Sequence, residues 1–258
     1  MTRTALVTGS TSGIGLAIAR ALGAQGFDLL LHGLAEPAAA DALCAELAAA
    51  HGVRVRHDGS DLARPDGAAA LMQAAATHFG GVDVLVNNAG IQRVAPVDEL
   101  APADWDRIIA INLTAAFHTV RLALPHMKHA RWGRIVNIAS AHALVASPYK
   151  AAYVASKHAI AGFTKAVALE VAELGITVNA VCPGYVRTPL VDAQIPETAR
   201  ARGISEEAVV RDVLLHAQPT RRFVAADEVG ALTVFLCSDA AASITGAVLP
   251  VDGGWTAQ

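Results

Sequence analysis

Seven short runs of β-branched or leucine-rich residues alternate along this chain with longer, alanine-rich segments. The runs are Thr4-Thr8, Asp28-His32, Val53-His57, Val82-Asn87, Gly133-Ala139, Thr177-Val181 and Ala247-Val251. Sustained alternation of this kind predicts an α/β fold with a doubly wound parallel sheet of the Rossmann type, because right-handed crossovers place helices on both faces. We therefore expect residues 1–258 to form a single domain with about seven strands, whose ligands lie at the carboxyl ends of the strands.

Residues 188–218 interrupt the regular alternation after the sixth strand. This region carries Pro189, Pro196 and Gly203 between mixed charges. A long insertion at the ligand-facing edge predicts a lid over the substrate. An ordinary surface helical hairpin is the alternative.

Composition and charge argue against several classes of protein. Hydrophobic residues make up 53% of the chain and charged residues 17%, which suits a compact fold and not a disordered chain. The net charge is −3 and the densest basic pair is Arg221-Arg222, so nucleic acid is not expected as a main partner.

Two further absences in the sequence bear on location and on metals. No run of about 18 apolar residues is free of charge, Gly or Pro, and the N-terminus lacks the apolar stretch of a signal peptide. We therefore expect a cytoplasmic protein that is not bound to a membrane. Cys44, Cys182 and Cys237 form no CxxC pair, so neither a disulfide framework nor a metal site is expected.

A glycine-rich turn joins the first predicted strand to the first predicted helix. It reads Thr8-Gly9-Ser10-Thr11-Ser12-Gly13-Ile14-Gly15. Glycines permit a tight turn and close approach of the backbone to a pyrophosphate, and the helix N-terminus supplies N–H donors and partial positive charge. The strand before and the helix after this turn are the context that a dinucleotide-binding domain requires.

The end of the second strand favours NAD over NADP. It reads His32-Gly33-Leu34, and neither it nor Thr11 places a cation where a 2′-phosphate would bind. Asp61 and Leu62, after the third strand, are candidates to hold the adenine. The sequence Asn87-Asn88-Ala89-Gly90 ends the fourth strand, where small residues let the cofactor pass close to the backbone.

Four polar residues form the candidate catalytic set. Tyr153 and Lys157 lie four residues apart in an apolar helical segment, which puts them side by side on one face. A neighbouring lysine favours the phenolate, and together with the positive charge of a nearby nicotinamide it is expected to lower the pKa of Tyr153 from about 10 toward neutrality. Ser140 ends the fifth strand, where its hydroxyl can donate to a substrate oxygen. Asn112 is polar within an apolar helical run, which suggests a helix distortion and a water leading to Lys157.

Together with the glycine turn, these residues resemble the short-chain dehydrogenase/reductase family. The match includes Asn88-Ala89-Gly90 and Pro183-Gly184 and covers essentially the whole chain. The resemblance implies that Tyr153 donates and accepts the proton, Lys157 supports it and binds ribose, Ser140 binds the substrate oxygen and Asn112 supports a proton relay. It also implies a homotetramer. The full predicted cofactor-binding set is Gly9, Thr11, Gly13, Ile14, Gly15, Leu34, Asp61, Leu62, Asn88, Gly90, Tyr153, Lys157, Pro183, Gly184, Val186 and Thr188.

Four further polar residues bear on the substrate. His142 follows Ser140 by two residues, Lys150 precedes Tyr153 by about one helical turn, Gln92 follows the Asn88-Ala89-Gly90 turn, and Gln194 lies in the predicted lid. If the lid closes, two potential cations and two amides converge beside Ser140 and Tyr153. Such a set suits a small carboxylate.

Within the family, the chain resembles the bacterial D-3-hydroxybutyrate dehydrogenases. The similarity lies in the glycine turn, Asn87-Gln92, Ala139-His142, Val186-Val191 and Val251-Ala257. It implies NAD-dependent oxidation of (R)-3-hydroxybutyrate to acetoacetate. The implied substrate-binding set is Gln92, Ser140, His142, Lys150, Tyr153, Tyr185 and Gln194.

The chain departs from that group at three positions. Tyr185 replaces a usual Trp beside the substrate methyl, Ala143 a usual Gly, and His32 a common Asn. Tyr185 therefore leaves the substrate chain length open. The alternatives are a 3-oxoacyl-thioester reductase using NADPH or another short-chain alcohol dehydrogenase. A nucleotide-sensing protein with a dead site is disfavoured, because the Ser/Tyr/Lys set is intact.

Overall fold

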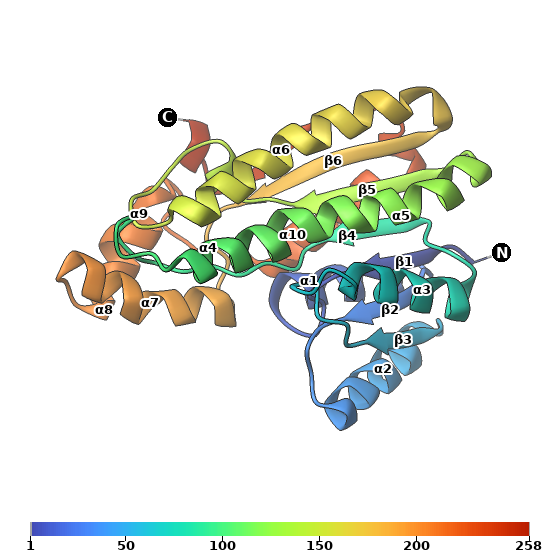
Figure 1. The fold of residues 1–258 in the computed structure, drawn as a ribbon, viewed down its shortest axis with the longest axis horizontal. Helices are drawn as coiled ribbons and strands as arrows, with labels where there is room; N and C mark the ends of the chain where they lie inside the picture. The colour runs from blue at the N-terminus through green and yellow to red at the C-terminus, as the bar shows by residue number, and fades with distance from the viewer. Residues whose placement is uncertain (1, 258) are drawn as a thin grey trace.

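The computed structural model describes residues 2–257, and a seven-stranded sheet runs through its centre (Figure 1). All neighbouring strands are parallel, and the predicted Rossmann-type doubly wound sheet is confirmed. The strands are β1 (Thr4–Val7), β2 (Asp28–His32), β3 (Val55–Asp58), β4 (Val84–Asn87), β5 (Gly133–Ile138), β6 (Ile176–Pro183) and β7 (Val248–Val251). Their order is β3-β2-β1-β4-β5-β6-β7, so the direction of winding reverses between β1 and β4. Ligands of such sheets bind where the winding reverses.

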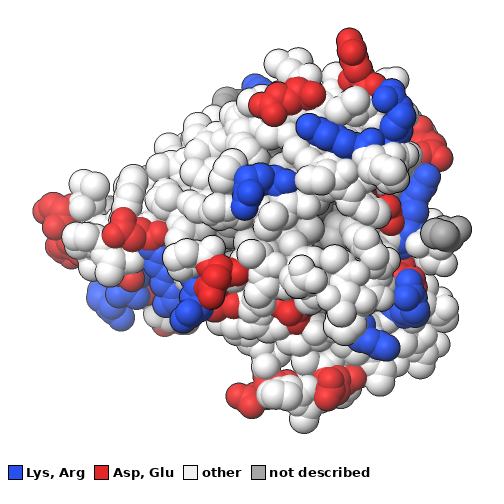
Figure 2. All heavy atoms as spheres, turned by 45° about the vertical axis from the view of Figure 1, so that its right-hand side comes forward, with Lys and Arg blue, Asp and Glu red and all other residues white. Residues whose placement is uncertain are grey.

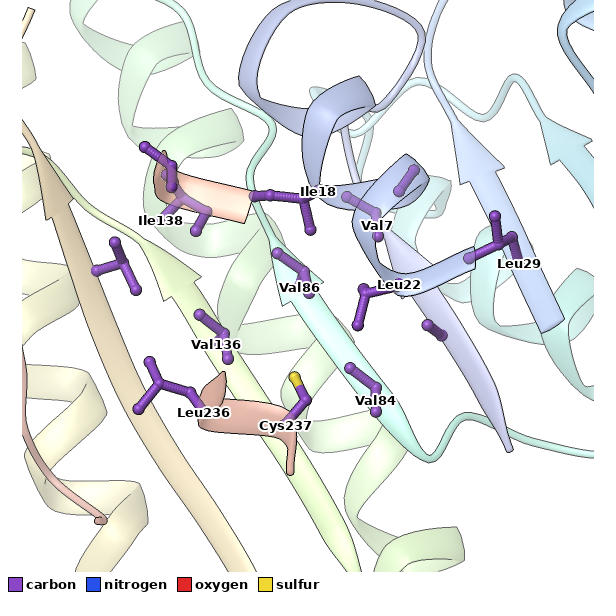
Figure 3. Close-up of a cluster of buried hydrophobic side chains, with 14 of the residues drawn as sticks. Val7, Ile18, Leu22, Leu29, Val84, Val86, Val136, Ile138, Leu236 and Cys237 are labelled. Atoms are coloured by element: carbon purple, nitrogen blue, oxygen red, sulfur yellow. The ribbon is translucent and has the colours of Figure 1, made fainter. Parts of the chain in front are cut away.

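One face of the sheet is covered by α1 (Gly13–Ala24), α2 (Pro37–His51) and α10 (Ala226–Cys237). Side chains alternate between faces along a strand, so Val7 contributes to this layer whereas Leu6 contributes to the opposite one. Figure 3 shows Ile18 and Leu22 of α1 together with Leu236 of α10 above the strand residues. Because both faces of the central strands are buried, β1, β2 and β4 consist mainly of apolar residues.

The opposite face is covered by α3 (Gly67–Phe79), α5 (Ala115–Ala130) and α6 (Ala151–Val171). A short helix, α4 (Pro102–Ile109), leads through a π-helical turn, η1 (Ala110–Thr114), into α5. The combined helix Pro102–Ala130 is long and apolar enough to cross a membrane by length and composition, a feature that the search for uninterrupted apolar runs missed. Its buried residues, among them Val120 and Met127, pack against the sheet.

The segment predicted as a lid forms helices beyond one end of the sheet, seen in orange in Figure 1. It comprises α7 (Pro189–Arg202), α8 (Glu206–Ala208), the π-helical η4 (Val209–Leu214) and α9 (Leu215–Ala217). Buried Val191, Ile195, Val209 and Leu214 form a small separate core with Tyr185. Short 3₁₀ turns complete the chain: η2 (Ala141–Ala143), η3 (Ala172–Leu174), η5 (Asp239–Ala241) and η6 (Trp255–Ala257).

Charged side chains of both signs are spread over the surface. On the face in Figure 2, Lys and Arg alternate with Asp and Glu between wide uncharged areas. Several charged residues of the chain form exposed ion pairs, such as Arg20 with Glu46 and Arg222 with Glu228. Pairs of this kind contribute little to stability.

Candidate active site

A cavity of about 360 Å³ opens at the carboxyl ends of the strands. It is lined by residues at the ends of β1 to β6 and by parts of α6 and α7. Apart from Gly15 and Asn112, every residue of the predicted catalytic, cofactor and substrate sets lines this one cavity. Sequence reasoning missed several other lining residues, which include Ser12, His32, Ser60, Ile91, Arg107 and Trp255.

The glycine turn lies against the turn that follows β4. Gly9 has φ +63°, and a Cβ there would lie 2.9 Å from Cα of Ala89. Asn88 Nδ2 donates to the carbonyl oxygens of Thr8 and Gly9, at 2.9 Å each. Gly15 does not line the cavity and lies behind the turn. It packs so closely there that a Cβ would overlap the Gly9 carbonyl. The turn and the N-terminus of α1 thus leave a cradle that fits a pyrophosphate.

His32 fixes the glycine turn to the loop after β3. Its Nδ1 accepts from the Gly9 amide at 3.1 Å, so the ring proton is on Nε2, which donates to the Ser60 carbonyl at 2.8 Å. Burial lowers the pKa of His32, in agreement with this neutral form. The sequence reading noted His32 only as a departure from a related group. Its contacts with Gly9 and Ser60 give His32 a role in positioning the glycine turn.

The adenosine end of the cavity carries no added cation from β2. Gly33 and Leu34 follow the strand, and a Cβ on Gly33 would lie 2.6 Å from Thr11 Oγ1. The Asp61 carboxylate is turned toward its own loop, where Oδ1 accepts from the Ala63 amide at 2.9 Å. This end therefore presents hydroxyls, backbone and one acid.

Tyr153 and Lys157 lie one turn apart on α6, as their spacing predicts. The Lys157 amine donates to the carbonyl of Ile138 at 2.8 Å and lies 5.6 Å from the centre of the Tyr153 ring. The protein's own groups do not lower the pKa of Tyr153. Shielding from water raises the pKa of Tyr153 to about 12, opposed by a hydrogen bond with Ser140, and burial lowers the pKa of Lys157 to about 8. The protein's own groups therefore favour the protonated phenol, the form that donates a proton in the reduction.

Asn112 lies within the π-helical turn η1, where the sequence suggested a distortion. Its Oδ1 accepts from the Ile91 amide at 2.8 Å, and its Nδ2 donates to the Ile91 carbonyl at 2.9 Å and to Ser156 Oγ at 3.2 Å. A second cavity of about 10 Å³, at the lower limit for one water molecule, lies between Asn112 and Lys157. Asn112 lies outside the main cavity and acts on it through these neighbours.

Gln92, Lys150 and Gln194 meet at the other end of the cavity. Gln194 Oε1 accepts from Gln92 Nε2 at 2.5 Å and from Lys150 Nζ at 3.0 Å. A lysine amine only donates, which identifies the accepting atom as oxygen. Gln194 Nε2 donates to its own helix, at the carbonyl of Leu190. Helix α7 therefore holds Lys150 in place across 44 residues of sequence.

His142 is not the second cation that the sequence suggested. Burial, followed by the nearby charge of Lys150, lowers the pKa of His142 to about 3. Its Nε2 contacts Ser147 Oγ at 2.9 Å and its Nδ1 lies 3.4 Å from Ser140 Oγ. Lys150, whose pKa burial lowers to about 8, is therefore the cation of this end of the cavity.

Aromatic rings close the cavity beside Lys150. Tyr185 stacks on Trp255, with centroids 5.1 Å apart, and His142 meets Trp255 edge-on at 4.9 Å. The Asp252 carboxylate orders the turn that presents Trp255, because it accepts from the amide and hydroxyl of Thr256 at 2.9 and 2.6 Å. The position of Trp255 just after the last parallel strand was the available signal for this missed residue.

The backbone at Tyr185 is tied to the far end of the inserted helices. Gln218 Oε1 accepts from the Tyr185 amide, and Gln218 Nε2 donates to the Arg222 carbonyl, at 2.5 Å each. The Val224 amide donates to the Tyr185 carbonyl at 2.9 Å, and Val186 pairs with Val224 as an isolated bridge. The two ends of the insertion are therefore joined to each other.

Metal chemistry has no candidate donor set in the part of the chain that the structure describes. Residues 2–257 contain no group of three or more His, Cys, Asp or Glu side chains able to hold an ion. Among the polar side chains that line the cavity are instead those of Ser140, Tyr153, Lys157 and Lys150. They suit proton transfer and binding of an anionic substrate.

Comparison with known proteins agrees with this arrangement. The family model for short chain dehydrogenases matches residues 3–199. A D-beta-hydroxybutyrate dehydrogenase from Rhizobium meliloti (strain 1021) is 54% identical, and the match covers 100% of both chains. A D-beta-hydroxybutyrate dehydrogenase from Cupriavidus necator is also 54% identical, and that match covers 99% of this chain and 98% of the relative. The crystal structure of an actinorhodin polyketide ketoreductase variant with NADPH superimposes with a TM-score of 0.93 at 37% identity, covering 100% of this chain and 98% of that one.

The chain therefore belongs to the short-chain dehydrogenase family, as its motifs predicted. It is an oxidoreductase that uses a nicotinamide dinucleotide, and the cradle formed by Gly9, Gly13 and the N-terminus of α1 fits the pyrophosphate of such a cofactor.

Proposed function

We propose that this protein catalyses the reversible, NAD-dependent oxidation of (R)-3-hydroxybutyrate to acetoacetate. The observation that carries the proposal is the buried amine of Lys150, which lies in the same cavity as Ser140 and Tyr153. Its hydrogen-bond partners, Gln194 and Tyr185, are neutral, and no carboxylate of residues 2–257 forms an ion pair with it. A buried cation without an anion favours a carboxylate ligand.

The proposed chemistry assigns one role to each polar group near the carbinol. A bound nicotinamide supplies the hydride acceptor, and its positive charge favours the phenolate of Tyr153. Ser140 Oγ donates to the reacting oxygen and holds it beside Tyr153. In the oxidation the hydroxyl proton passes to Tyr153, and in the reduction Tyr153 returns it. Lys157 stabilises the phenolate and binds ribose, and Asn112 keeps α6 and the turn after β4 in register.

The choice of NAD rests on charge at the adenosine end. A 2′-phosphate needs a cation there, and the residues that follow β2, together with Thr11, supply none. The related ketoreductase structure contains NADPH, so the cofactor must be tested directly. We expect kcat/KM for NAD to exceed that for NADP by at least tenfold.

A 3-oxoacyl-thioester reductase using NADPH is the second candidate. The high structural similarity to a polyketide ketoreductase favours it. A thioester, however, carries no carboxylate to pair with Lys150. The thioester reading therefore leaves the buried cation without a partner.

We also propose a lid, an assembly and a location. Helices α7–α9 act as the lid over the substrate, since Gln194 of α7 contacts Gln92 and Lys150. Exposed Phe117 on α5 and Leu169 on α6 support a homotetramer built on these helices. The protein acts in the cytoplasm. Sedimentation of the purified protein tests the assembly.

The deciding experiment measures NADH formation with each enantiomer of 3-hydroxybutyrate, in parallel with NADP. We expect turnover of the (R) enantiomer with NAD and much slower turnover of (R)-butan-2-ol, which lacks the carboxylate. Reduction of a 3-oxoacyl thioester with NADPH, without (R)-selective oxidation of 3-hydroxybutyrate at millimolar concentration, would refute the proposal in favour of the second candidate.

A further inference from the structure

The hydroxyl of Tyr185 has a proton that the described protein does not use. Its oxygen accepts from Lys150 Nζ at 3.3 Å, which leaves the O–H free to donate. Within residues 2–257, no hydrogen bond has this hydroxyl as its donor, although Tyr185 is only 6% exposed. Buried donors are almost always paired, so this one indicates a ligand. Burial raises the pKa of Tyr185, which keeps the proton on the oxygen.

The position of this hydroxyl is fixed from three sides. The ring stacks on Trp255 at an interplanar angle of 15°. The backbone amide and carbonyl of Tyr185 are held by Gln218 and Val224. Lys150 Nζ lies 5.2 Å from the ring centroid and bonds the oxygen at the ring's end. A donor fixed in this way loses little conformational freedom when a ligand binds.

We propose that the hydroxyl of Tyr185 binds the substrate carboxylate directly, donating to one oxygen while Lys150 binds the same group. The inference rests on the proposed function for the identity of the substrate. It places Tyr185 at the charged end of the substrate, whereas the family resemblance implied a place beside the methyl group. Together, the Lys150 amine and the Tyr185 hydroxyl provide two hydrogen-bond donors that bind the carboxylate.

The chemistry of the pair favours an anion over a neutral group. A hydroxyl that accepts from a cation is polarised and becomes a stronger donor. Hydrogen bonds to a charged acceptor contribute more than those between neutral groups. Loss of the Tyr185 hydroxyl is therefore expected to weaken a carboxylate ligand much more than a ketone of the same size.

Binding of butyrate to the NADH complex tests the inference without turnover. The dissociation constant is measured by ligand-observed NMR for wild type and for Tyr185→Phe, with butan-2-one as the neutral probe. We expect the substitution to raise the butyrate dissociation constant about tenfold and the butan-2-one constant less than twofold. The matched control is Tyr149→Phe, because Tyr149 lies outside the cavity with its ring near Arg202. It should leave both constants unchanged.

A second background separates direct binding from an effect through Lys150. In Lys150→Met, adding Tyr185→Phe should still weaken butyrate several-fold if the hydroxyl itself binds the carboxylate. No additional weakening means that Tyr185 acts only by holding Lys150, and the inference falls. It also falls if wild type does not bind butyrate, or if Tyr185→Phe affects both probes equally. Failure of the proposed function is a distinct result, namely butyrate binding without oxidation of (R)-3-hydroxybutyrate.

Discussion

The cofactor end of the cavity is shaped by backbone, whereas the end around Lys150 is shaped by side chains from distant segments. At the cofactor end, Gly9 and Gly15 pack against their neighbours without a Cβ, and the contacts come from a continuous turn. At the substrate end, Gln92, Lys150 and Gln194 are joined across 102 and 44 residues of sequence. The first end depends on local geometry and the second on the packing of the inserted helices.

This difference separates what each end contributes to the reaction. Backbone geometry tolerates few substitutions, so it serves a cofactor that many substrates share. Side-chain networks change with single substitutions. Here Tyr185 is proposed to lie at the charged end of the substrate and not beside its methyl group, and His142 is neutral and not a cation. Among related enzymes, substrate choice is therefore expected to change through residues at the end around Lys150, while the cofactor end stays constant.

Tyr153→Phe should produce the largest separation between binding and turnover. The substitution removes the transferable proton and keeps the ring, so kcat should fall at least about 1000-fold while the NADH dissociation constant changes less than threefold. Steady-state kinetics and NADH fluorescence titration measure the two quantities. Activity within tenfold of wild type would contradict the assignment of Tyr153 as the acid/base.

Gly15→Ala should damage the cofactor end selectively. The new Cβ overlaps the Gly9 carbonyl and displaces the glycine turn, so NADH should bind at least about tenfold more weakly. The control is Gly162→Ala in α6, where a Cβ meets nothing within 4 Å. Equal NADH affinities in the two variants would show that the turn adapts, and the contrast between the two ends would weaken.

Leu34→Arg should alter cofactor choice without altering substrate choice. Leu34 is 69% exposed at the cavity edge, so an arginine there is free to reach a 2′-phosphate. We expect kcat/KM for NADP to rise about tenfold, with KM for 3-hydroxybutyrate unchanged. Measurement with both cofactors checks this, and an unchanged NADP efficiency would place the adenosine ribose elsewhere.

The buried histidine of the substrate end should make the fold sensitive to acid. The pKa of His142 falls to about 3 on folding from about 6.5 when unfolded, so the unfolded chain binds the proton first as pH decreases. The contribution of neutral His142 to stability is complete above about pH 6.5 and is lost progressively below it, toward pH 3. Between pH 6 and pH 5, wild type should lose about 1 kcal/mol more unfolding free energy than His142→Gln.

Urea unfolding at the two pH values measures this effect. His129→Gln, at an exposed position in α5, is the control and should keep the wild-type pH dependence. An identical loss of stability in wild type and His142→Gln would indicate that the imidazole is not buried in its neutral form.

The same contrast explains what the sequence could predict. The glycine turn and the Tyr153/Lys157 pair are local patterns, and strand–helix alternation was enough to predict the sheet. The effect of burial on the pKa values of His142 and Tyr153 could not be predicted from the sequence, because desolvation depends on neighbours from other segments. Trp255 was missed because its contact with Tyr185 spans two loops that only the fold brings together.

Tyr185 is hydrogen-bonded to Gln218 and Val224, and we call this set of contacts the clasp. It makes the inserted helices a separate structural unit. Because the clasp holds the start and the end of the insertion side by side, its length and content can change without pulling on β6 or α10. The entropic cost of closing a longer loop across such a clasp grows only slowly with loop length. Exchange of these inserted helices between relatives offers a route to new substrate ranges without a change in the cofactor-binding end of the cavity.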